Sequence, residues 1–162
     1  MNSIALLKTE DFATIERLAH EIWQQYYVPI IGEKQVAYMI KKFYCREALA
    51  AQHTEGQQFL MIYIDEKPSG YIGISRQQGA QYFLHKFYLD TKLHRKGVGS
   101  EIFKLLTAAY PDSKSIRLQV NINNFKSINF YFKCGFRIEK RYVLDIGEGY
   151  VMDDYIMVWS RK

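Results

Sequence analysis

The sequence contains few cysteines and lacks any cluster of metal-binding residues. Its two cysteines, Cys45 and Cys134, lie far apart and belong to no Cys-x-x-Cys motif. Two such thiols are typical of free cysteines in a reducing compartment, although their number alone would also permit a disulfide. The four histidines show no metal-ligand spacing, so we expect no metal site.

Long apolar runs are also missing. The N-terminus carries Lys8, Glu10 and Asp11 where a signal peptide needs an apolar core, and no apolar stretch approaches membrane length. We therefore expect a cytoplasmic protein without a membrane partner. The net charge of +5 comes from scattered Lys and Arg residues, which permits an anionic ligand but argues against a nucleic-acid partner.

The chain of 162 residues is 48% hydrophobic, which favours a single folded domain spanning 1–162. Hydrophobic periodicity and turn residues predict strands at 3–7, 59–64, 71–76, 81–89, 115–120, 136–145 and 150–159. They predict helices after Thr9, after Gly32, after Gly99 and at 125–134. This order indicates a mixed α/β domain, in which a right-handed crossover makes strands 81–89 and 115–120 parallel.

A glycine-containing loop between a strand and a helix is the central feature of the chain. After strand 81–89, the basic residues Lys92, Arg95 and Lys96 precede Gly97 and Gly99, and an apolar helix follows. Glycine lets the backbone approach a ligand closely, and the first N–H groups of a helix attract anions. The loop is therefore predicted to bind a phosphate or pyrophosphate.

Two common phosphate-binding motifs are excluded by the residues that follow these glycines. A Rossmann motif requires a third glycine where this chain has Ile102, and a P-loop requires Gly-Lys-Ser/Thr where Gly99 is followed by Ser-Glu. The remaining pattern, a basic loop followed by Gly-x-Gly, resembles the acetyl-CoA loop of the GNAT superfamily of N-acetyltransferases. His94 departs from the family pattern, which has Gln or Arg at that position.

A second stretch, residues 124–136, strengthens the resemblance. It is similar to the GNAT pattern Asn-x-x-Ala-x-x-Phe-Tyr-x-Lys-x-Gly-Phe, with Ser127 in place of the alanine. The two motifs occur in the family's order with a strand between them, which is far more specific than either alone. Trp23 with Tyr27, residues 85–88 and residues 145–155 further resemble the bacterial PaiA-like branch of polyamine acetyltransferases.

The resemblance implies a GNAT fold: a central mixed, mostly antiparallel, twisted sheet of about seven strands with helices on both faces. It implies acetyl-CoA as cosubstrate and a primary amine as acceptor, which attacks the thioester directly in a ternary complex. Asn124 would bond to the cofactor or order the loop beneath it. The resemblance assigns the oxyanion and pantetheine arm to the amides of Phe87, Tyr88 and Leu89, and the pyrophosphate to those of His94, Arg95, Lys96, Gly97, Val98, Gly99 and Ser100.

Two side chains are candidates for proton transfer. Tyr131 resembles the family tyrosine that protonates the departing coenzyme A thiolate, and a phenol stays protonated at neutral pH. The alternative is a tyrosine packed beneath the sheet. His85 is the candidate base, because strand alternation would place it on the same face as Phe87, and bulk water is the alternative proton acceptor.

The resemblance implies that the last two strands flank the acceptor side of the cleft, where acidic residues would favour a cationic acceptor such as a polyamine or a lysine-like side chain. The alternative is that these carboxylates keep the hairpin soluble and discourage edge pairing. Trp23 and Tyr27 could pack against its methylenes or over an ammonium. Strand alternation sends adjacent residues to opposite faces, so at most one of the last two carboxylates can face the acceptor. The four acidic residues are Asp145, Glu148, Asp153 and Asp154.

Two other functions remain open at this stage. A protein with the same cofactor site could sense acyl-CoA without turnover, and the substitution at His94 is compatible with that function. A basic nucleic-acid binder is the second alternative, although the chain lacks a concentrated Lys/Arg segment. The sequence permits a homodimer and defines neither the oligomeric state nor the identity of the amine.

Overall fold

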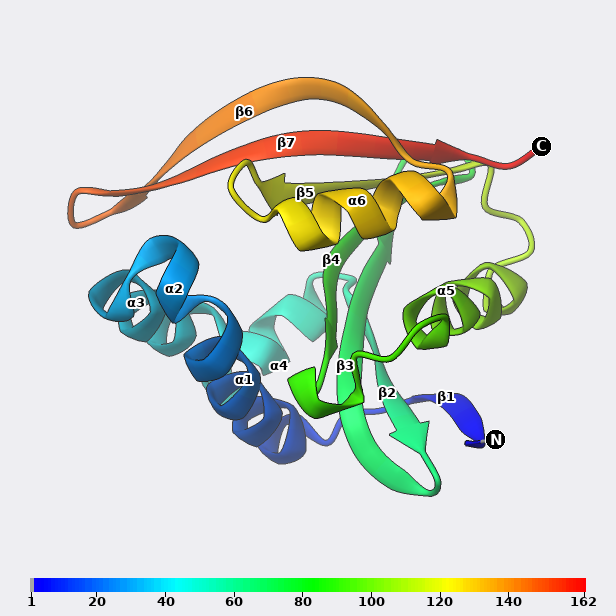
Figure 1. The fold of residues 1–162 in the computed structure, drawn as a ribbon, viewed down its shortest axis with the longest axis horizontal. Helices are drawn as coiled ribbons and strands as arrows, with labels where there is room; N and C mark the ends of the chain where they lie inside the picture. The colour runs from blue at the N-terminus through cyan, green and yellow to red at the C-terminus, as the bar shows by residue number, and fades with distance from the viewer. Residues whose placement is uncertain (1) are drawn as a thin grey trace.

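A seven-stranded sheet runs through the computed structural model, which describes residues 2–162 (Figure 1). The strands are β1 (Ile4–Lys8), β2 (Gln58–Ile64), β3 (Lys67–Arg76), β4 (Gln81–Leu89), β5 (Ser115–Asn121), β6 (Arg137–Gly147) and β7 (Tyr150–Ser160). The helices are α1 (Phe12–Tyr26), α2 (Val28–Ile31), α3 (Glu33–Phe43), α4 (Arg46–Thr54), the 3₁₀ turn η1 (Thr91–Leu93), α5 (Val98–Ala109) and α6 (Phe125–Cys134). This architecture confirms the mixed, mostly antiparallel sheet that the sequence predicted.

The strands lie in the order β1-β2-β3-β4-β5-β7-β6, and β4–β5 is the parallel pair, as the crossover rule predicted. Their pairing extends only from Gln81 opposite Ser115 to Leu84 opposite Leu118. Beyond that point β4 continues to Leu89 and β5 to Asn121 without pairing to each other. The two strands therefore diverge, and the sheet has a gap in its middle.

A β-bulge at His85 begins the divergent part of β4. Gly73 on β3 is opposite Lys86 and Ile74 is opposite Leu84, so His85 is the extra residue. A bulge changes the alternation of side chains along a strand. Leu84 and Phe87 accordingly pack in the same hydrophobic cluster, although three positions separate them.

Helices cover both faces of the sheet and enclose two separate cores. One face carries α5 and α6 over a cluster that includes Ile102, Leu106 and Ile128. The other face carries α1 to α4 over a cluster that includes Ile15, Val36 and Leu49. Figure 1 shows α5 to one side of the central strands and the α1–α3 group to the other.

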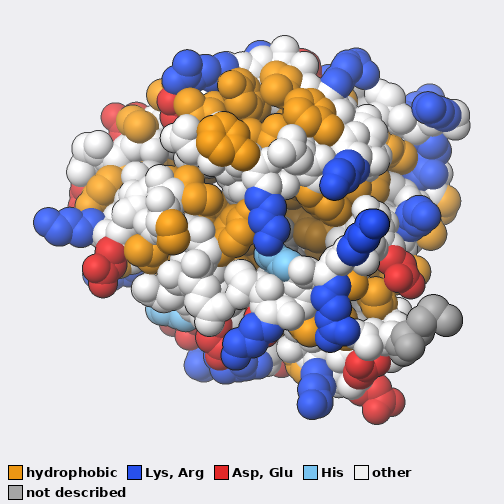
Figure 2. All heavy atoms as spheres, viewed as in Figure 1, with side chains coloured by type: hydrophobic (Ala, Val, Ile, Leu, Met, Phe, Trp, Pro, Cys, Tyr) orange, Lys and Arg blue, Asp and Glu red, His pale blue; other side chains and the backbone are white. Residues whose placement is uncertain are grey.

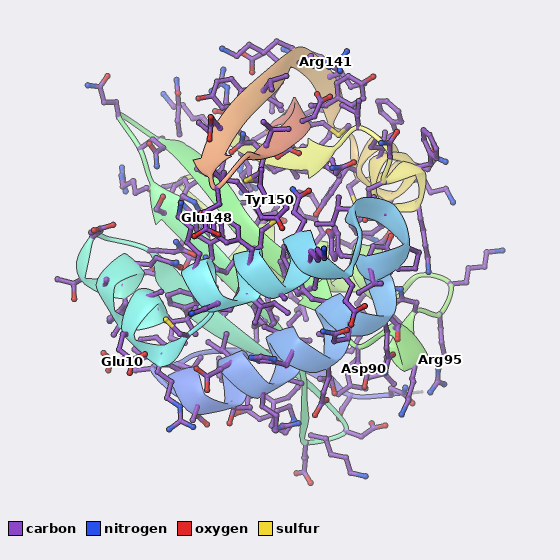
Figure 3. The ribbon with its side chains drawn as sticks, turned by 90° about the vertical axis from the view of Figure 1, so that its left-hand side faces the viewer. Glu10, Asp90, Arg95, Arg141, Glu148 and Tyr150 are labelled. Atoms are coloured by element: carbon purple, nitrogen blue, oxygen red, sulfur yellow. The ribbon has the colours of Figure 1, made fainter. Side chains whose placement is uncertain are left out.

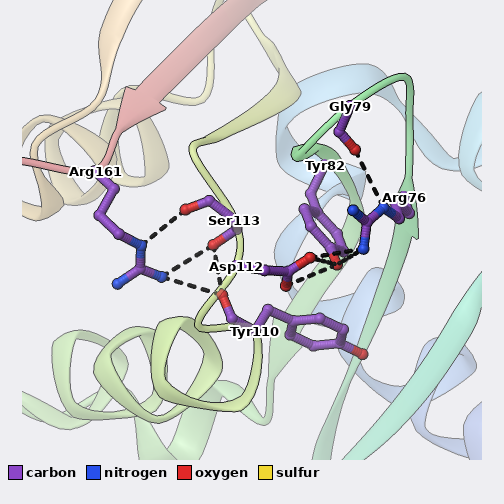
Figure 4. Close-up of polar contacts among 7 residues, drawn as sticks. All are labelled: Arg76, Gly79, Tyr82, Tyr110, Asp112, Ser113 and Arg161. Carbon is purple, nitrogen blue, oxygen red and sulfur yellow. Dashed lines mark hydrogen bonds and ion pairs between the residues drawn. The ribbon is translucent and has the colours of Figure 1, made fainter.

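Polar contacts fix the connection between α5 and β5 (Figure 4). Arg161, beyond the end of β7, donates to Ser113 O, Thr107 O and Tyr110 O at 2.8, 2.9 and 3.1 Å. On the other side of the turn, Asp112 accepts hydrogen bonds from Arg76 and Tyr82. The end of the chain is thus attached to the helix that starts at the glycine loop.

The structure differs from the sequence prediction mainly near the N-terminus. Asp11, rather than Thr9, caps α1, because its carboxylate accepts the N–H of Thr14 at 3.1 Å. Helices α2 and α4 were not predicted. Only one residue of α4, Leu49, is buried, so its sequence has almost no apolar period to detect.

Candidate functional site

A cavity of about 920 Å³ passes through the gap between β4 and β5. On the α5–α6 face it is lined by the glycine loop, Phe87 and Phe130, and on the other face by Tyr27 and Tyr88. Its volume is in the range of small-molecule and cofactor sites. Two molecules can therefore meet in the middle of the sheet, one from each face.

The glycine loop presents free backbone N–H groups to the cavity. Among residues 2–162, the N–H groups of Lys96, Gly97, Gly99 and Ser100 have no backbone acceptor. Gly97 precedes α5 with φ +90°, a left-handed conformation that glycine adopts without strain. Four free donors at a helix N-terminus form an anion site.

Three of the amides that we expected to bind the pyrophosphate have acceptors within the protein. His94 N donates to Thr91 O, Arg95 N to Leu93 O and Val98 N to Arg95 O. The free amides of the loop are therefore better candidates for the pyrophosphate than these three. Turn formation between η1 and α5 uses these donors, and the sequence pattern does not distinguish them from the free ones.

Basic side chains surround the part of the cavity beside the loop. Arg95 and Lys96 come from the loop, and Lys126 and Lys133 come from one side of α6, two turns apart. Figure 2 shows a hollow in the surface whose rim carries several Lys and Arg side chains. We had not singled out Lys126 and Lys133 as site residues, although both lie within the second motif.

His94 attaches the loop to β4 and to α6. Its Nε2 lies 2.9 Å from Leu89 O and its Nδ1 lies 3.0 Å from Lys126 Nζ. Because a carbonyl only accepts and an ammonium only donates, Nε2 carries the proton and Nδ1 is unprotonated. Partial burial is the main cause that lowers the pKa of His94, and the Lys126 charge acts in the same direction. The imidazole is therefore neutral.

Backbone donors of β4 also point into the gap. Asp90 N donates to Ser69 O on the β3 side at 2.8 Å. N–H groups two residues apart point the same way, so Tyr88 N also points to β3, whereas Phe87 N and Leu89 N point away from it. Of the three amides assigned to the oxyanion and pantetheine arm, that of Tyr88 consequently belongs to the sheet.

Tyr131 lies inside the site, on α6. It is buried, lines the cavity, and its ring packs against Phe130 and Phe136 at 5.2 and 5.3 Å between centroids. Burial raises the pKa of Tyr131 far above its ordinary value, and nearby Tyr27 adds to the effect. The hydroxyl group is thus protonated at any physiological pH.

His85 lines the cavity, but its ring does not lie on the face of Phe87. His85 Nε2 is 2.7 Å from Ser75 Oγ and the ring is 4.8 Å from Phe83, whereas Phe87 packs against Phe130 at 5.8 Å. The alternation prediction is wrong because the bulge falls at His85. Desolvation, with a smaller contribution from the Lys86 charge, lowers the pKa of His85 to about 4.

Asn124 ties α1 to α6. Its side chain is buried, its Oδ1 accepts Tyr26 Oη at 2.8 Å and Ser127 N at 3.2 Å, and its Nδ2 donates to Tyr27 Oη at 3.3 Å. Both polar atoms of the amide are thus bonded within the protein, and Asn124 is not among the residues that line the cavity. Of the two roles expected for Asn124, this geometry supports ordering of the loop rather than contact with the cofactor.

Aromatic rings from α1 and the sheet form the other end of the cavity. Tyr27 stacks on Trp23 at 4.4 Å and meets Tyr88 edge-on at 5.9 Å. Asp154 of β7 lies on the same face of the sheet, because it alternates with Tyr150 and Met152, which pack in the cluster of these rings. Burial is the main cause that raises the pKa of Tyr27, and Tyr88, Tyr26 and Asp154 add to it. Burial and the Asp153 charge raise the pKa of Asp154 itself to about 6.

The comparisons with known proteins agree with this geometry. Residues 15–136 match the model of the acetyltransferase (GNAT) family. The chain belongs to this family. Membership confirms the predicted enzyme class, an acetyl-CoA-dependent N-acetyltransferase, and the predicted cosubstrate.

Relatives of this family cover nearly the whole chain. A spermidine N(1)-acetyltransferase from Thermoplasma acidophilum is 27% identical over 144 residues, 84% of this chain and 88% of the relative. The crystal structure of PaiA N-acetyltransferase from T. acidophilum with coenzyme A has a TM-score of 0.80 and 23% identity, covering 98% and 99% of the chains. A GCN5-related N-acetyltransferase from Rhodopseudomonas palustris has a TM-score of 0.79 and 17% identity, covering 98% and 96%.

Three further observations concern partners and cofactors. No helix within residues 2–162 is long and apolar enough to cross a membrane. In the same part of the chain, no three His, Cys, Asp or Glu residues are arranged to hold a metal ion. Cys45 and Cys134 are both free thiols, in agreement with the sequence prediction.

Proposed function

We propose that this family member acetylates small primary amines, with aliphatic polyamines as the favoured acceptors. The observation that carries the proposal is the cavity through the sheet, with free amides and cations on one face and aromatic rings on the other. The buried carboxylate of Asp154 belongs to the face that carries the rings. The spermidine acetyltransferase relative supports the acceptor class. Two free thiols are typical of a reducing compartment, so we place the protein in the cytoplasm.

The cofactor site follows from the free donors. Lys96, Gly97, Gly99 and Ser100 provide amides for the pyrophosphate, and the α5 N-terminus adds its positive potential. The amides of Phe87 and Leu89 face the gap, where the pantetheine arm would extend and the thioester carbonyl would gain negative charge. Donors already fixed by the sheet stabilise such an oxyanion without reorganisation.

In the proposed reaction, the amine attacks the thioester carbonyl through the gap while both substrates are bound. The carbon–sulfur bond breaks, and the Tyr131 hydroxyl donates its proton to the departing thiolate. The hydroxyl group is protonated before the reaction and lies in the wall of the cavity. Tyr131 then recovers a proton from solvent or from the amine.

We propose that the proton of the acceptor ammonium leaves to water rather than to His85. An imidazole with a pKa of about 4 is a weak base at neutral pH, and its Nε2 is already engaged with Ser75. Its ring also lies on the face opposite Phe87. These features argue against the base role that strand alternation had suggested.

Thiol release from acetyl-CoA, measured with a panel of amines, tests the proposed function. We expect turnover with spermidine and spermine, and weaker turnover with butylamine and with a lysine-containing peptide. Acetyl-CoA binding in calorimetry without thiol release for any amine would favour the sensor alternative and overturn the proposal.

A further inference from the structure

Asp154 differs from the other acidic residues of the last hairpin. Asp145 accepts a hydrogen bond from the N–H of Gly147 at 2.8 Å, and Glu148 is exposed in the turn. Asp153 forms a bidentate ion pair with Arg141, with N–O distances of 2.8 and 2.6 Å. Asp145 and Asp153 therefore have local structural roles, and Glu148 faces solvent. Only Asp154 is buried, with 3% of its surface exposed.

The buried carboxylate of Asp154 has no partner within residues 2–162. It receives no hydrogen bond and forms no ion pair, and the causes that act on its pKa are burial and the like charge of Asp153. Burying a charge without a partner is costly. Such a group in a binding region is typical of a site whose partner is the ligand.

The strand geometry places Asp154 on the acceptor face of the sheet. It alternates with Tyr150 and Met152, which pack against the cluster beneath α1–α3, and it is paired with Asn121 on β5. Figure 3 shows Tyr150 and Glu148 next to α3, where the Tyr38 and Tyr150 rings are 5.0 Å apart. The hairpin is thus held over the helices that provide the aromatic rings.

The surroundings of Asp154 favour a cation. Tyr27 and Tyr88 line the cavity on the same face of the sheet, and aromatic faces attract ammonium groups. The Lys and Arg residues that line the cavity come from the glycine loop and α6. Lys86, whose Nζ is 5.5 Å from the centre of the Tyr44 ring, is held away by hydrogen bonds to Gln52 and Gln57.

We propose that Asp154 binds the non-reacting ammonium of the acceptor and thereby selects aliphatic diamines and polyamines over monoamines. The inference rests on the proposed function, because it concerns the acceptor of the same reaction. Asn121, the partner of Asp154, lies three residues along β5 from Leu118, where the gap opens. Three residues of strand span about 10 Å, a distance that an extended polyamine bridges.

The Asp154→Asn variant tests whether Asp154 selects polyamines over monoamines, with Asp153→Asn as the matched control. The parent is expected to have a higher kcat/KM for spermidine than for a monoamine of similar length. Asp154→Asn removes the buried charge pair between the carboxylate and the ammonium of spermidine, which should reduce kcat/KM for spermidine by about 30-fold or more. The kcat/KM for the monoamine should stay the same. Equal losses for both amines, or the same loss in Asp153→Asn, would overturn the inference.

A measurement without turnover separates this inference from the proposed function. Spermidine alone should raise the Tm of the parent and of Asp153→Asn, but not that of Asp154→Asn. This shift is expected even if no amine in the panel is acetylated, in which case only the proposed function fails. Absence of a shift in the parent would overturn the role of Asp154.

Stability in the absence of amine provides a third readout. The fold raises the pKa of Asp154 from 3.8 to about 6, so this carboxyl contributes stability below its ordinary pKa that is lost as the pH rises through 6. Asp154→Asn should therefore have a higher Tm than the parent at pH 8 and no advantage at pH 4. A lower Tm than the parent at pH 8 would show that the carboxylate is stabilised by the protein and would contradict the inference.

Discussion

Tyr131 is the residue on which the proposed chemistry depends most directly. It is buried, it lines the cavity, and its hydroxyl group is protonated. Replacing one hydroxyl by hydrogen changes neither the packing of the ring nor the backbone of α6. The Tyr131→Phe substitution, which removes only the hydroxyl oxygen, therefore separates the chemical role of Tyr131 from its structural role.

Tyr131→Phe is expected to lower kcat about 100-fold with little change in the Kd of acetyl-CoA, because loss of a general acid typically costs this much. Steady-state kinetics and calorimetry measure the two quantities. Tyr155→Phe, on β7 in the same core, is the control and should keep normal kcat. A parent-like kcat in Tyr131→Phe would restrict the tyrosine to packing.

Gly97 determines the geometry of the anion site. Its φ of +90° costs an L-residue about 1–2 kcal/mol, so Gly97→Ala should displace the loop amides and weaken coenzyme A binding about tenfold. Gly79→Ala is the control, because Gly79 has φ +65° and, like Gly97, open space around it. Calorimetry should show unchanged affinity in that variant, and equal affinities in both would refute the role of Gly97.

Gly99 makes a less informative substitution site. A Cβ there would lie 2.8 Å from Phe130 Cε1, so a larger residue would displace a ring that lines the cavity as well as disturb the loop. A loss of binding in Gly99→Val would therefore not separate backbone access from packing between α5 and α6.

His85 offers a test of the base. If water takes the proton, His85→Ala should change kcat by less than about threefold and leave the pH profile of kcat/KM unchanged. The fold lowers the pKa of His85 to about 4, so its contribution to stability is present above pH 6.5 and lost as the pH falls through 4. A profile whose acidic limb disappears in the variant would identify His85 as the base.

At the scale of elements, the site depends on how α1, α6 and β4 are joined. Asn124 connects the end of α1 to the start of α6, and His94 connects the glycine loop to β4 and α6. These side chains bridge segments that carry different parts of the cavity wall. Loss of either connection would alter the position of the wall rather than the chemistry of one group.

Asn124→Ala should reduce the free energy of unfolding by about 1–3 kcal/mol, because it removes a helix cap, the partner of Tyr27 Oη and one of the two partners of Tyr26 Oη. Urea unfolding measures the change. The exposed neighbour provides the control, and Asn123→Ala should differ from the parent by less than about 0.5 kcal/mol. Similar losses in both variants would mean that Asn124 has no special structural role.

The sequence predicted those elements whose signals are local. Helix α6 begins and ends where the motif indicated, with Gly135 in the left-handed conformation at its end. The sequence did not predict the bulge at His85, because alternation continues across it and only the partner strand shows the extra residue. The contacts of Asn124 were equally inaccessible, since Tyr26 and Tyr27 lie 98 and 97 positions away in the chain.

For the whole molecule, charge separates the two substrates. The chain has a net charge of +5, and Arg95, Lys96, Lys126 and Lys133 line the cofactor half of the cavity. Such a field attracts coenzyme A, which carries phosphates, and repels a polyamine. A cationic acceptor therefore needs a carboxylate near its own binding position to offset this repulsion. We propose that Asp154 is that carboxylate.

The affinity for coenzyme A should fall as salt rises, because exposed charges are screened within a Debye length of about 10 Å at 0.1 M and about 3 Å at 1 M. Calorimetry at low and high sodium chloride measures the trend. Pantetheine, which occupies the same arm without phosphates, should show a nearly flat dependence. A flat dependence for coenzyme A itself would show that the rim cations do not contribute to binding.

The divergence of β4 and β5 also determines how molecules leave the site. Coenzyme A would withdraw past α5 and α6, and the acetylated amine past α1, so neither product blocks the exit of the other. An inhibitor that joins both substrates would have to thread the opening between two backbones. The linker of such an inhibitor could be no thicker than an extended chain. Two halves that enter from opposite faces and react with each other inside the protein would reach the site more easily than the complete inhibitor.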